Sequence, residues 1–372
     1  MLRFLIRAGV LAMLTLVVLE SFFTWVLPAS CQPRNRQDAS TGLVSFDRSW
    51  RKSGVISHGP LCKQPSRWQI NKAGYNSIYD YVDAGARARP LVALLGDSFV
   101  QGFYSDVQEH MEVHLNELFQ GDVDVYAFGH AGAHLAQYMA MTEHFERVYD
   151  PDVYVYVVHG AVERAVDTPV RTYFSIAATD SGFELIPPRV TYQQRGIGRT
   201  IFRSSLLRYL YLNNRLIPAQ NAIAVPDMGW LDTWTEADVA RYRRAGRFAL
   251  AWLDSVAPGK PKVFVVDAPR DQIYESTEDL VRDMDYQVLS VVCDEFPDSY
   301  CLDLAPVFRE NWQREQRAFN PDFDPHWNAH GDRVVAAAIW SFLRANDLVR
   351  TTGSVVPVRA VETASSAAGT AP

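Results

Sequence analysis

The sequence predicts an α/β protein: a three-layer α/β/α sandwich in which a mostly parallel sheet lies between two layers of helices. Short runs rich in apolar residues predict the strands, at residues 91–95, 123–127, 153–158, 262–266 and 300–304. The most apolar of these runs lack the polar alternation of a strand with one wet face, as is typical of strands covered on both sides. Longer stretches between most runs predict helices, at residues 108–119, 135–148, 236–256, 278–292 and 334–343. Strands that alternate with helices pair in parallel through right-handed crossovers.

The first 30 residues predict a transmembrane anchor. Residues 4–27 form an apolar stretch long enough to span a bilayer, which needs about 20 residues of helix. Arg3 and Arg7 favour a cytoplasmic N-terminus, and Trp25 lies where an interfacial aromatic residue is expected. Glu20 is unfavourable, since a carboxylate inside a span costs about 2 to 3 kcal/mol. We therefore predict a single-pass protein of the inner, cytoplasmic membrane, with its main domain in the periplasm or outside the cell.

A cleaved signal peptide is the alternative to this anchor. The tripeptide Pro28-Ala29-Ser30 is a poor small-residue cleavage site. Cys31 lacks the Leu three positions earlier that lipid attachment would require. The sequence therefore favours neither processing route.

The length of 372 residues would allow two domains, but the two ends of the chain are not expected to contribute to a core. One large domain is predicted over residues 68–350, preceded by an extended linker at 31–67 that has no periodicity. The alternation of predicted strands and helices is interrupted at about 167–234, which predicts an insertion over the ligand crevice. The tail at 351–372 lacks periodicity and is predicted to be disordered.

Composition and cysteine spacing exclude several function classes. A formal net charge of -7, with no basic stripe, argues against nucleic acid or an anionic surface as the main partner. Four cysteines are present, and no CxxC pair or Cys/His cluster has metal-ligand spacing, so no metal site is predicted. In an oxidising compartment Cys293 and Cys301 could pair, whereas Cys31 and Cys62 could equally be buried or idle thiols.

The tripeptide Gly96-Asp97-Ser98 follows the apolar run 91–95 directly and predicts a nucleophile. Open α/β sheets bind ligands outside the carboxyl ends of their strands, so a serine on this turn faces a crevice rather than the core. The alternative is that Ser98 is a turn residue whose hydroxyl caps the next segment.

The segment Asp324-Pro325-His326-Trp327-Asn328 offers a general base and a carboxylate to orient it. An isolated His326 would more often be a surface or satisfied core histidine, but the neighbouring Asp324 favours the base. Together with Ser98, these residues indicate a Ser-His-Asp hydrolase or acyltransferase.

Three blocks in this order resemble the SGNH/GDSL hydrolase superfamily, in particular its membrane-anchored bacterial branch. The blocks are residues 95–102, with a lead-in at 70–75, then 128–133 and 324–331. The resemblance covers roughly residues 70–343. It implies that Ser98 attacks an ester carbonyl, that His326 removes its proton and that Asp324 orients the imidazole. It also implies an oxyanion hole made by the backbone N–H groups of Ser98 and Gly132.

The chain departs from the family pattern at two places. The family's commoner spacing puts the aspartate three residues before the histidine, where this chain has Phe323. Asp324 lies two residues before His326, a spacing that resembles the periplasmic alginate O-acetylation enzymes. Asp322 is the alternative candidate for the orienting carboxylate. The third block's Gly-x-Asn-Asp is missing, and the strand 153–158 is followed by His159. We hypothesise that His159 supplies the missing oxyanion donor.

The resulting prediction is a serine esterase or O-acyltransferase that needs no cofactor. Its substrate would be an O-acylated small molecule or polysaccharide, with an acetylated cell-envelope glycan preferred, and envelope assembly proteins are possible partners. The alternative is a noncatalytic polysaccharide-binding or assembly protein, which the missing Asn motivates. Structural roles are expected for His130, His134 and His330, and Arg270 could either meet an anionic substrate or form a structural ion pair.

Overall fold

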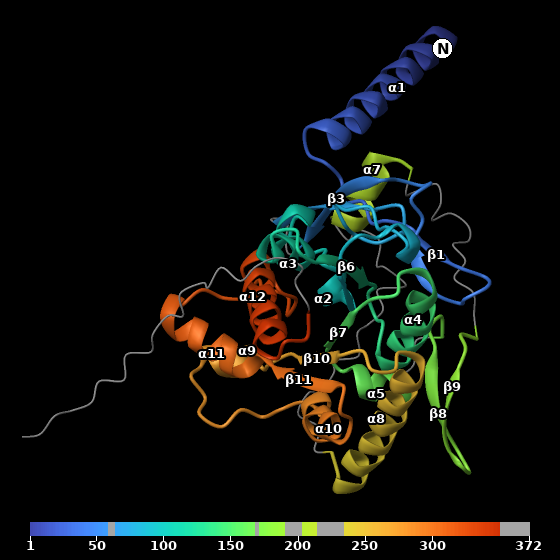
Figure 1. Ribbon diagram of the computed structural model, residues 1–372. Coiled ribbons are helices and arrows are strands. Elements are labelled where there is room, and N and C mark those ends of the chain that lie inside the picture. Colours follow the sequence, from blue (N-terminus) through green and yellow to red (C-terminus); the bar gives the residue numbers. More distant parts are fainter. Residues whose placement is uncertain (59–63, 168–170, 190–202, 214–233, 350–372) are drawn as a thin grey trace, which may run out of the picture.

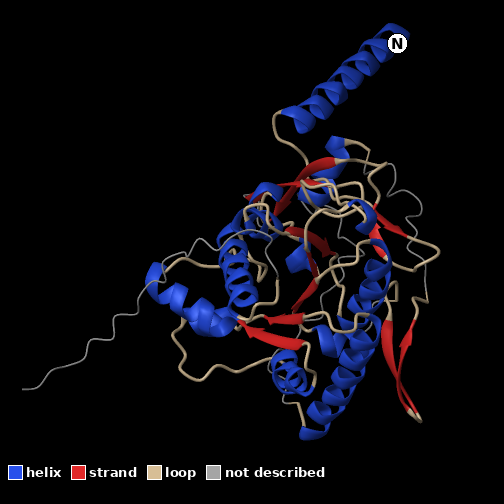
Figure 2. Cartoon of the chain, viewed as in Figure 1, coloured by secondary structure: helices blue, strands red, loops and turns tan. Residues whose placement is uncertain are grey.

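The computed structural model describes residues 1–58, 64–167, 171–189, 203–213 and 234–349. Its centre is a five-stranded parallel sheet in the order β11-β10-β7-β5-β6. The strands are β5 (Leu91–Gly96), β6 (Asp124–Gly129), β7 (Val153–Val158), β10 (Lys262–Val266) and β11 (Ser299–Asp303). Helices lie on both faces of this sheet (Figure 1, Figure 2). The predicted three-layer α/β architecture is therefore confirmed.

Alternate residues of the strands enter two separate apolar cores. Leu91, Ala93 and Leu95 of β5 pack on one face, while Val92 and Leu94 pack on the other. The first face is covered by α4 (Leu135–Val148), α5 (Ala161–Val166), α8 (Glu236–Val256) and α10 (Met284–Val292). The second is covered by α3 (Met111–Phe119), α9 (Arg270–Tyr274), α11 (Leu304–Glu315) and α12 (Ala329–Ala345). Because both faces are covered, β5 and β7 are buried at every position and consist almost entirely of apolar residues.

Several predicted elements end at different residues in the structure. The helix expected at 278–292 starts at Met284, because Asp283 accepts a hydrogen bond from the backbone N–H of Tyr286 and caps it there. The segment directly after β7, for which no helix was predicted, contains α5. The helix α11 was not predicted from the sequence. The helix α5 is only six residues long, so tertiary packing rather than local propensity decides it.

The segment 31–67 differs from the extended linker that the sequence predicts. It contains β1 (Asn35–Gln37) paired with β2 (Val44–Phe46), and β3 (Ser53–His58) paired with β4 (Gln64–Gln69), both antiparallel. Phe46, Ile56 and Trp68 form a third small apolar core. Sparse large apolar residues, rather than a periodic run, hold this segment onto the domain.

The region predicted as an insertion at about 167–234 is described in part. It contains a hairpin of β8 (Ser175–Thr179) and β9 (Gly182–Ile186), then α7 (Ser205–Arg208), followed by one turn of π-helix at Tyr209–Asn213. The tail at 351–372 lies outside the described residues.

The remaining features are the N-terminal helix and the cysteines. Helix α1 (Leu2–Trp25) projects away from the domain in Figure 1. Its length and mean hydropathy of 2.1 suffice to cross a membrane, a property that membrane anchors and signal sequences share. Cys293 and Cys301 form a disulfide between the end of α10 and β11, and Cys31 is a buried free thiol. Cys62 lies outside the described residues.

Candidate active site

The turn after β5 holds Ser98 at the carboxyl edge of the sheet. The chain passes from Gly96 directly into the short helix α2 (Ser98–Gln101). Buried Asp97 caps this helix, since its Oδ1 accepts a 3.0 Å hydrogen bond from the backbone N–H of Phe99. The guanidinium of Arg164, 3.2 Å from Oδ2 of Asp97, balances the buried charge. The hydroxyl of Ser98 is therefore carried on a turn with little freedom to move.

Gly129 at the end of β6 allows α2 to lie close to the sheet. A Cβ added at this position would lie 2.1 Å from the backbone nitrogen of Gln101. Because that neighbour is backbone, a side chain here would displace the helix that carries Ser98. Gly129, in the second block of the sequence pattern, therefore allows the close packing that positions α2, in the first block.

His326 and Asp324 come from the loop before α12 and meet Ser98 in space. Nε2 of His326 lies 2.6 Å from Oγ of Ser98. Nδ1 of the same ring lies 2.5 Å from Oδ1 of Asp324, which also accepts a 2.9 Å hydrogen bond from the backbone N–H of His326. The structure therefore brings all three predicted triad residues together. Asp322 is exposed to solvent, and the carboxylate that contacts the His326 ring is that of Asp324.

Tyr104 adds a contact that the sequence did not reveal. Its ring stacks on the imidazole of His326, with the centroids 4.2 Å apart and the planes 5° from parallel. Its hydroxyl is hydrogen-bonded to Asp324. Burial raises the pKa of Asp324, but hydrogen bonds from His326 and Tyr104 and the charge of a protonated His326 outweigh burial and leave this pKa below its usual value. Asp324 thus stays ionised and able to hold the imidazole.

Arg270 braces the loop that carries the triad histidine. It is buried, forms an ion pair with Asp267, and donates a hydrogen bond to the backbone carbonyl of Pro325 at 2.5 Å. Of the two roles considered from the sequence, the structure shows the ion pair. Its guanidinium also lies over the ring of Phe99, 5.6 Å from the centroid.

His159 follows the end of β7, at the same edge of the sheet as Ser98. The neighbouring strands β5 and β7 are parallel, with Leu95 paired to Tyr156, so the chain leaves both strands at their carboxyl ends. Nδ1 of His159 is 3.3 Å from Oδ2 of Asp267, and its ring lies 4.7 Å from that of Phe99. Burial raises the pKa of Asp267, but the charge of Arg270 and the contact with His159 outweigh burial and hold it well below its usual range.

Gly132 lies in the turn that follows β6, the strand that pairs with β5. Its φ of 79° is in the left-handed region that favours glycine. The hydroxyl of Tyr173, from the insertion, donates to the backbone carbonyl of Ala131 at 2.7 Å and is hydrogen-bonded to Nδ1 of His130. His134 is buried against the same tyrosine ring. Burial lowers the pKa of His130 to about 4 and that of His134 to about 3, so both are neutral and structural.

His330 also has a structural position rather than a place in the triad. It is buried at the start of α12, and its Nε2 lies 3.1 Å from Oδ1 of Asn311. Among the residues that the structure describes, no group of three or more His, Cys, Asp or Glu side chains could hold a metal ion.

Arg164, Tyr104 and Gly129 are site residues for which sequence reasoning assigned no role. Arg164 follows the position of the missing third block, and Tyr104 comes six residues after Ser98. A single partly buried arginine or tyrosine has no spacing signal, since its partner is distant in sequence. Gly129 lies within the second block, at 128–133, and a glycine just after a predicted strand was the signal available in the sequence.

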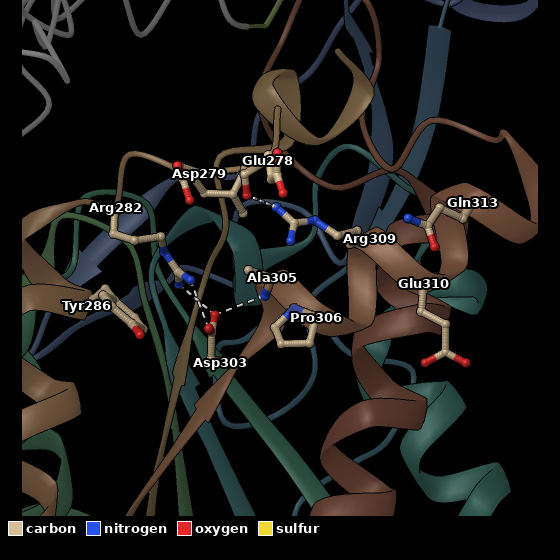
Figure 3. A pocket seen from close by; sticks show the side chains of 11 residues that line it. Glu278, Asp279, Arg282, Tyr286, Asp303, Ala305, Pro306, Arg309, Glu310 and Gln313 are labelled. Carbon is tan, nitrogen blue, oxygen red and sulfur yellow. Dashed lines mark hydrogen bonds and ion pairs between the residues drawn. The ribbon is translucent and has the colours of Figure 1, made fainter. Parts of the chain in front are cut away.

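A hollow of about 530 Å³ lies elsewhere, between the loop before α10 and helix α11 (Figure 3). Its two arginines are already engaged. Arg282 forms two hydrogen bonds with the carboxylate of Asp303, and Arg309 donates to the backbone carbonyls of Thr277 and Glu278. We therefore assign these arginines to the fold rather than to a ligand.

No model of a known protein family and no curated protein matches the chain. Solved structures with a similar fold include a salicylyl-acyltransferase from a tetracycline biosynthetic pathway, at 13% identity and a TM-score of 0.38 over 71% of this chain and 58% of that one. A two-domain esterase active on acetylated mannans is 12% identical with a TM-score of 0.37, over 74% and 54%. An acetyl xylan esterase from the rumen bacterium Butyrivibrio proteoclasticus is 9% identical with a TM-score of 0.36, over 70% and 65%. This chain thus matches little more than half the length of the first two proteins, and similarity at this level carries no argument about function.

Proposed function

We propose that the protein is a serine esterase or O-acyltransferase that uses Ser98, His326 and Asp324. The observation that supports this most strongly is the 2.6 Å contact between Oγ of Ser98 and Nε2 of His326. In the proposed reaction Oγ attacks the ester carbonyl, and its proton passes to Nε2. The carboxylate of Asp324 holds the ring in the tautomer that accepts this proton and stabilises the imidazolium that forms.

The negative oxygen of the tetrahedral intermediate needs hydrogen-bond donors near Ser98. We propose the backbone N–H groups of Ser98 and Gly132 and the side chain of His159. Collapse of the intermediate breaks the ester bond, and the leaving alcohol takes the proton from His326. Water or a sugar hydroxyl then attacks the acyl-serine, which yields hydrolysis or transfer respectively.

The substrate class follows from the chemistry and from the apolar helix. An O-acylated molecule is required, and we propose an acetylated cell-envelope glycan presented to a domain on the outer side of the inner membrane, where envelope assembly proteins would be its partners. The proposed chemistry needs no cofactor, since serine and histidine supply the nucleophile and the base.

A fluorophosphonate probe tests this proposal on the full chain in detergent. We expect the probe to label Ser98, identified by peptide mass, and the protein to hydrolyse p-nitrophenyl acetate. A folded wild-type protein that shows neither reaction would instead support the noncatalytic, polysaccharide-binding alternative. The absence of the Asn of the family's Gly-x-Asn-Asp block favours that alternative.

Tyr104 is proposed as a positioning residue, because its hydroxyl bonds Asp324. The substitution Tyr104→Phe keeps the stacked ring and removes this hydrogen bond, so we expect kcat to fall roughly 5- to 10-fold, equivalent to about 1 to 1.5 kcal/mol. KM should stay within about twofold, since the proposed role of Tyr104 is to hold Asp324 rather than to bind the substrate. Steady-state kinetics on p-nitrophenyl acetate separate the two constants. A rise in KM with unchanged kcat would place Tyr104 in substrate binding instead.

The donor role of His159 has a specific chemical requirement. Its Nδ1 faces the ionised Asp267, so Nε2 can donate to an oxyanion only when the ring is doubly protonated. If His159 is a donor, its loss should lower kcat about 100-fold, as for other oxyanion donors. We expect this loss for His159→Ala and a smaller one for His159→Gln, whose amide can still donate. Undiminished turnover in His159→Ala would remove the residue from the oxyanion hole.

A further inference from the structure

Glu20, the one carboxylate in the apolar N-terminal helix, is hydrogen-bonded to a distant part of the chain. Its Oε2 accepts hydrogen bonds from Oγ of Ser204 at 2.7 Å and from the backbone N–H of Leu206 at 3.0 Å. Its Oε1 accepts from the backbone N–H of Ser205 at 2.5 Å. Ser204 lies 184 residues away in sequence, so only the folded chain provides these donors. Hydrogen bonds to an ionised acceptor are about twice as strong as neutral ones.

Two further residues of α1 contact the same distant part of the chain as Glu20. The hydroxyl of Thr24, one turn after Glu20, donates to Oγ of Ser205 at 2.8 Å. The ring of Phe23 stacks on Tyr209, with centroids 4.0 Å apart. We call the segment at 204–213 the docking segment, since it contacts α1 through Ser204, Ser205, Leu206 and Tyr209. In Figure 1, α7 lies at the end of the domain nearest α1.

The burial pattern of α1 distinguishes a C-terminal end that is partly shielded by the domain from an N-terminal part that is exposed. Within the helix only Leu19, Glu20 and Phe23 are partly shielded, and these positions fall on one face of a helix. Residues 2–18 are all exposed, and this stretch is about 25 Å long at 1.5 Å per residue. An apolar rod of that length fits the bilayer core, which is about 30 Å thick, and puts Glu20 near the outer interface.

The residues just after the helix are built into the domain. Ala29, Ser30 and Cys31 are buried. The backbone N–H of Ser30 donates to Oδ1 of Asn213 at 3.0 Å, and that of Cys31 donates to the carbonyl of Val55 at 2.8 Å. The chain thus passes from α1 into a packed part of the fold without an exposed spacer.

We propose that α1 is retained in the mature protein as a bilayer anchor, and that Glu20 seats the docking segment at the membrane surface. A signal sequence that is cleaved off would not need hydrogen bonds to residues of the folded domain. Loss of α1 would leave the hydroxyl of Ser204 and two backbone N–H groups without their acceptor. The carboxylate that looks unfavourable for a span is thus a junction between anchor and domain. This inference does not depend on the esterase chemistry.

The mature N-terminus is the first test. The full chain is expressed in a bacterium with an active signal peptidase, extracted from membranes, and its intact mass is measured. We expect the mass of a chain that begins at residue 1 or 2. A chain that begins between residues 28 and 32, or a soluble periplasmic product, would overturn the proposal.

The junction itself is tested by hydrogen exchange on the full chain in lipid nanodiscs. We expect Glu20→Ala to speed exchange of the backbone amides of Ser205 and Leu206 by roughly tenfold or more, equivalent to loss of about 1.4 kcal/mol of local protection. Ser21→Ala is the matched control, since Ser21 is exposed and bonds only within α1. Equal protection in the two variants would overturn the junction, whatever the esterase activity of either one.

Discussion

The substitution Ser98→Ala is expected to lower kcat for p-nitrophenyl acetate by about 10⁴-fold or more. The alanine removes the only atom that the proposed mechanism uses to attack the ester, and His326 cannot replace it because its Nε2 is positioned to accept a proton from that atom. Residual turnover then reflects oxyanion stabilisation and binding alone. The measurement is steady-state hydrolysis by the full chain in detergent, with circular dichroism to show that the variant is folded.

The matched control for this experiment is Ser255→Ala. Ser255 is exposed on α8 and bonds only to a backbone carbonyl of the same helix. We expect its kcat to equal that of the wild type. If Ser98→Ala retained kcat within about tenfold, far less than the effect of removing a serine nucleophile, the proposed mechanism would fail.

The second large effect is expected for Asp324→Asn, with Asp322→Asn as its control. The amide cannot hold the imidazole in the tautomer that accepts the serine proton, so kcat should fall by about 10³- to 10⁴-fold. Asp322 is exposed and should leave kcat unchanged when replaced. The two variants carry the same change of charge two residues apart in one loop. A field effect of the charge would therefore appear in both, whereas an orienting role appears only at residue 324.

Kinetics of the pair also decide between the two aspartates considered from the sequence. A larger loss for Asp322→Asn than for Asp324→Asn would reverse the assignment, despite the 2.5 Å contact of Asp324 with the ring. Equal small losses would mean that no carboxylate orients His326 in the reaction.

Sequence patterns predicted the sheet well because the relevant information is local. The strands β5, β7 and β10 are buried on both faces, so their apolar runs are visible without knowledge of their neighbours. The helices α4 and α8 have amphipathic periodicity and were predicted with their observed ends. The fold of 31–67 was missed because its small core uses a few scattered residues, among them Phe46, Ile56 and Trp68.

Much of the candidate site was predictable for the same reason. The turn at Ser98 and the loop at His326 are each recognisable from adjacent residues. Tyr104 was not, because its function depends on the position of a ring contributed by residue 326. Arg164 was assigned no role, and the ion pair considered for Arg270 was predicted without its partner Asp267, because a guanidinium in sequence gives no indication of which carboxylate or carbonyl it will reach.

The sequence alone determined which segments form strands, which turn carries the serine and which loop carries the histidine, because apolar periodicity and turn chemistry act over a few residues. Only the tertiary structure decided that Ser98 and His326, 228 residues apart, lie within 2.6 Å. It also decided that Glu20 meets Ser204 rather than remaining unpaired in an apolar helix. Such contacts depend on the crossovers and packing of the whole chain, since hydrogen bonds between remote residues form only once the elements that carry them are fixed in place.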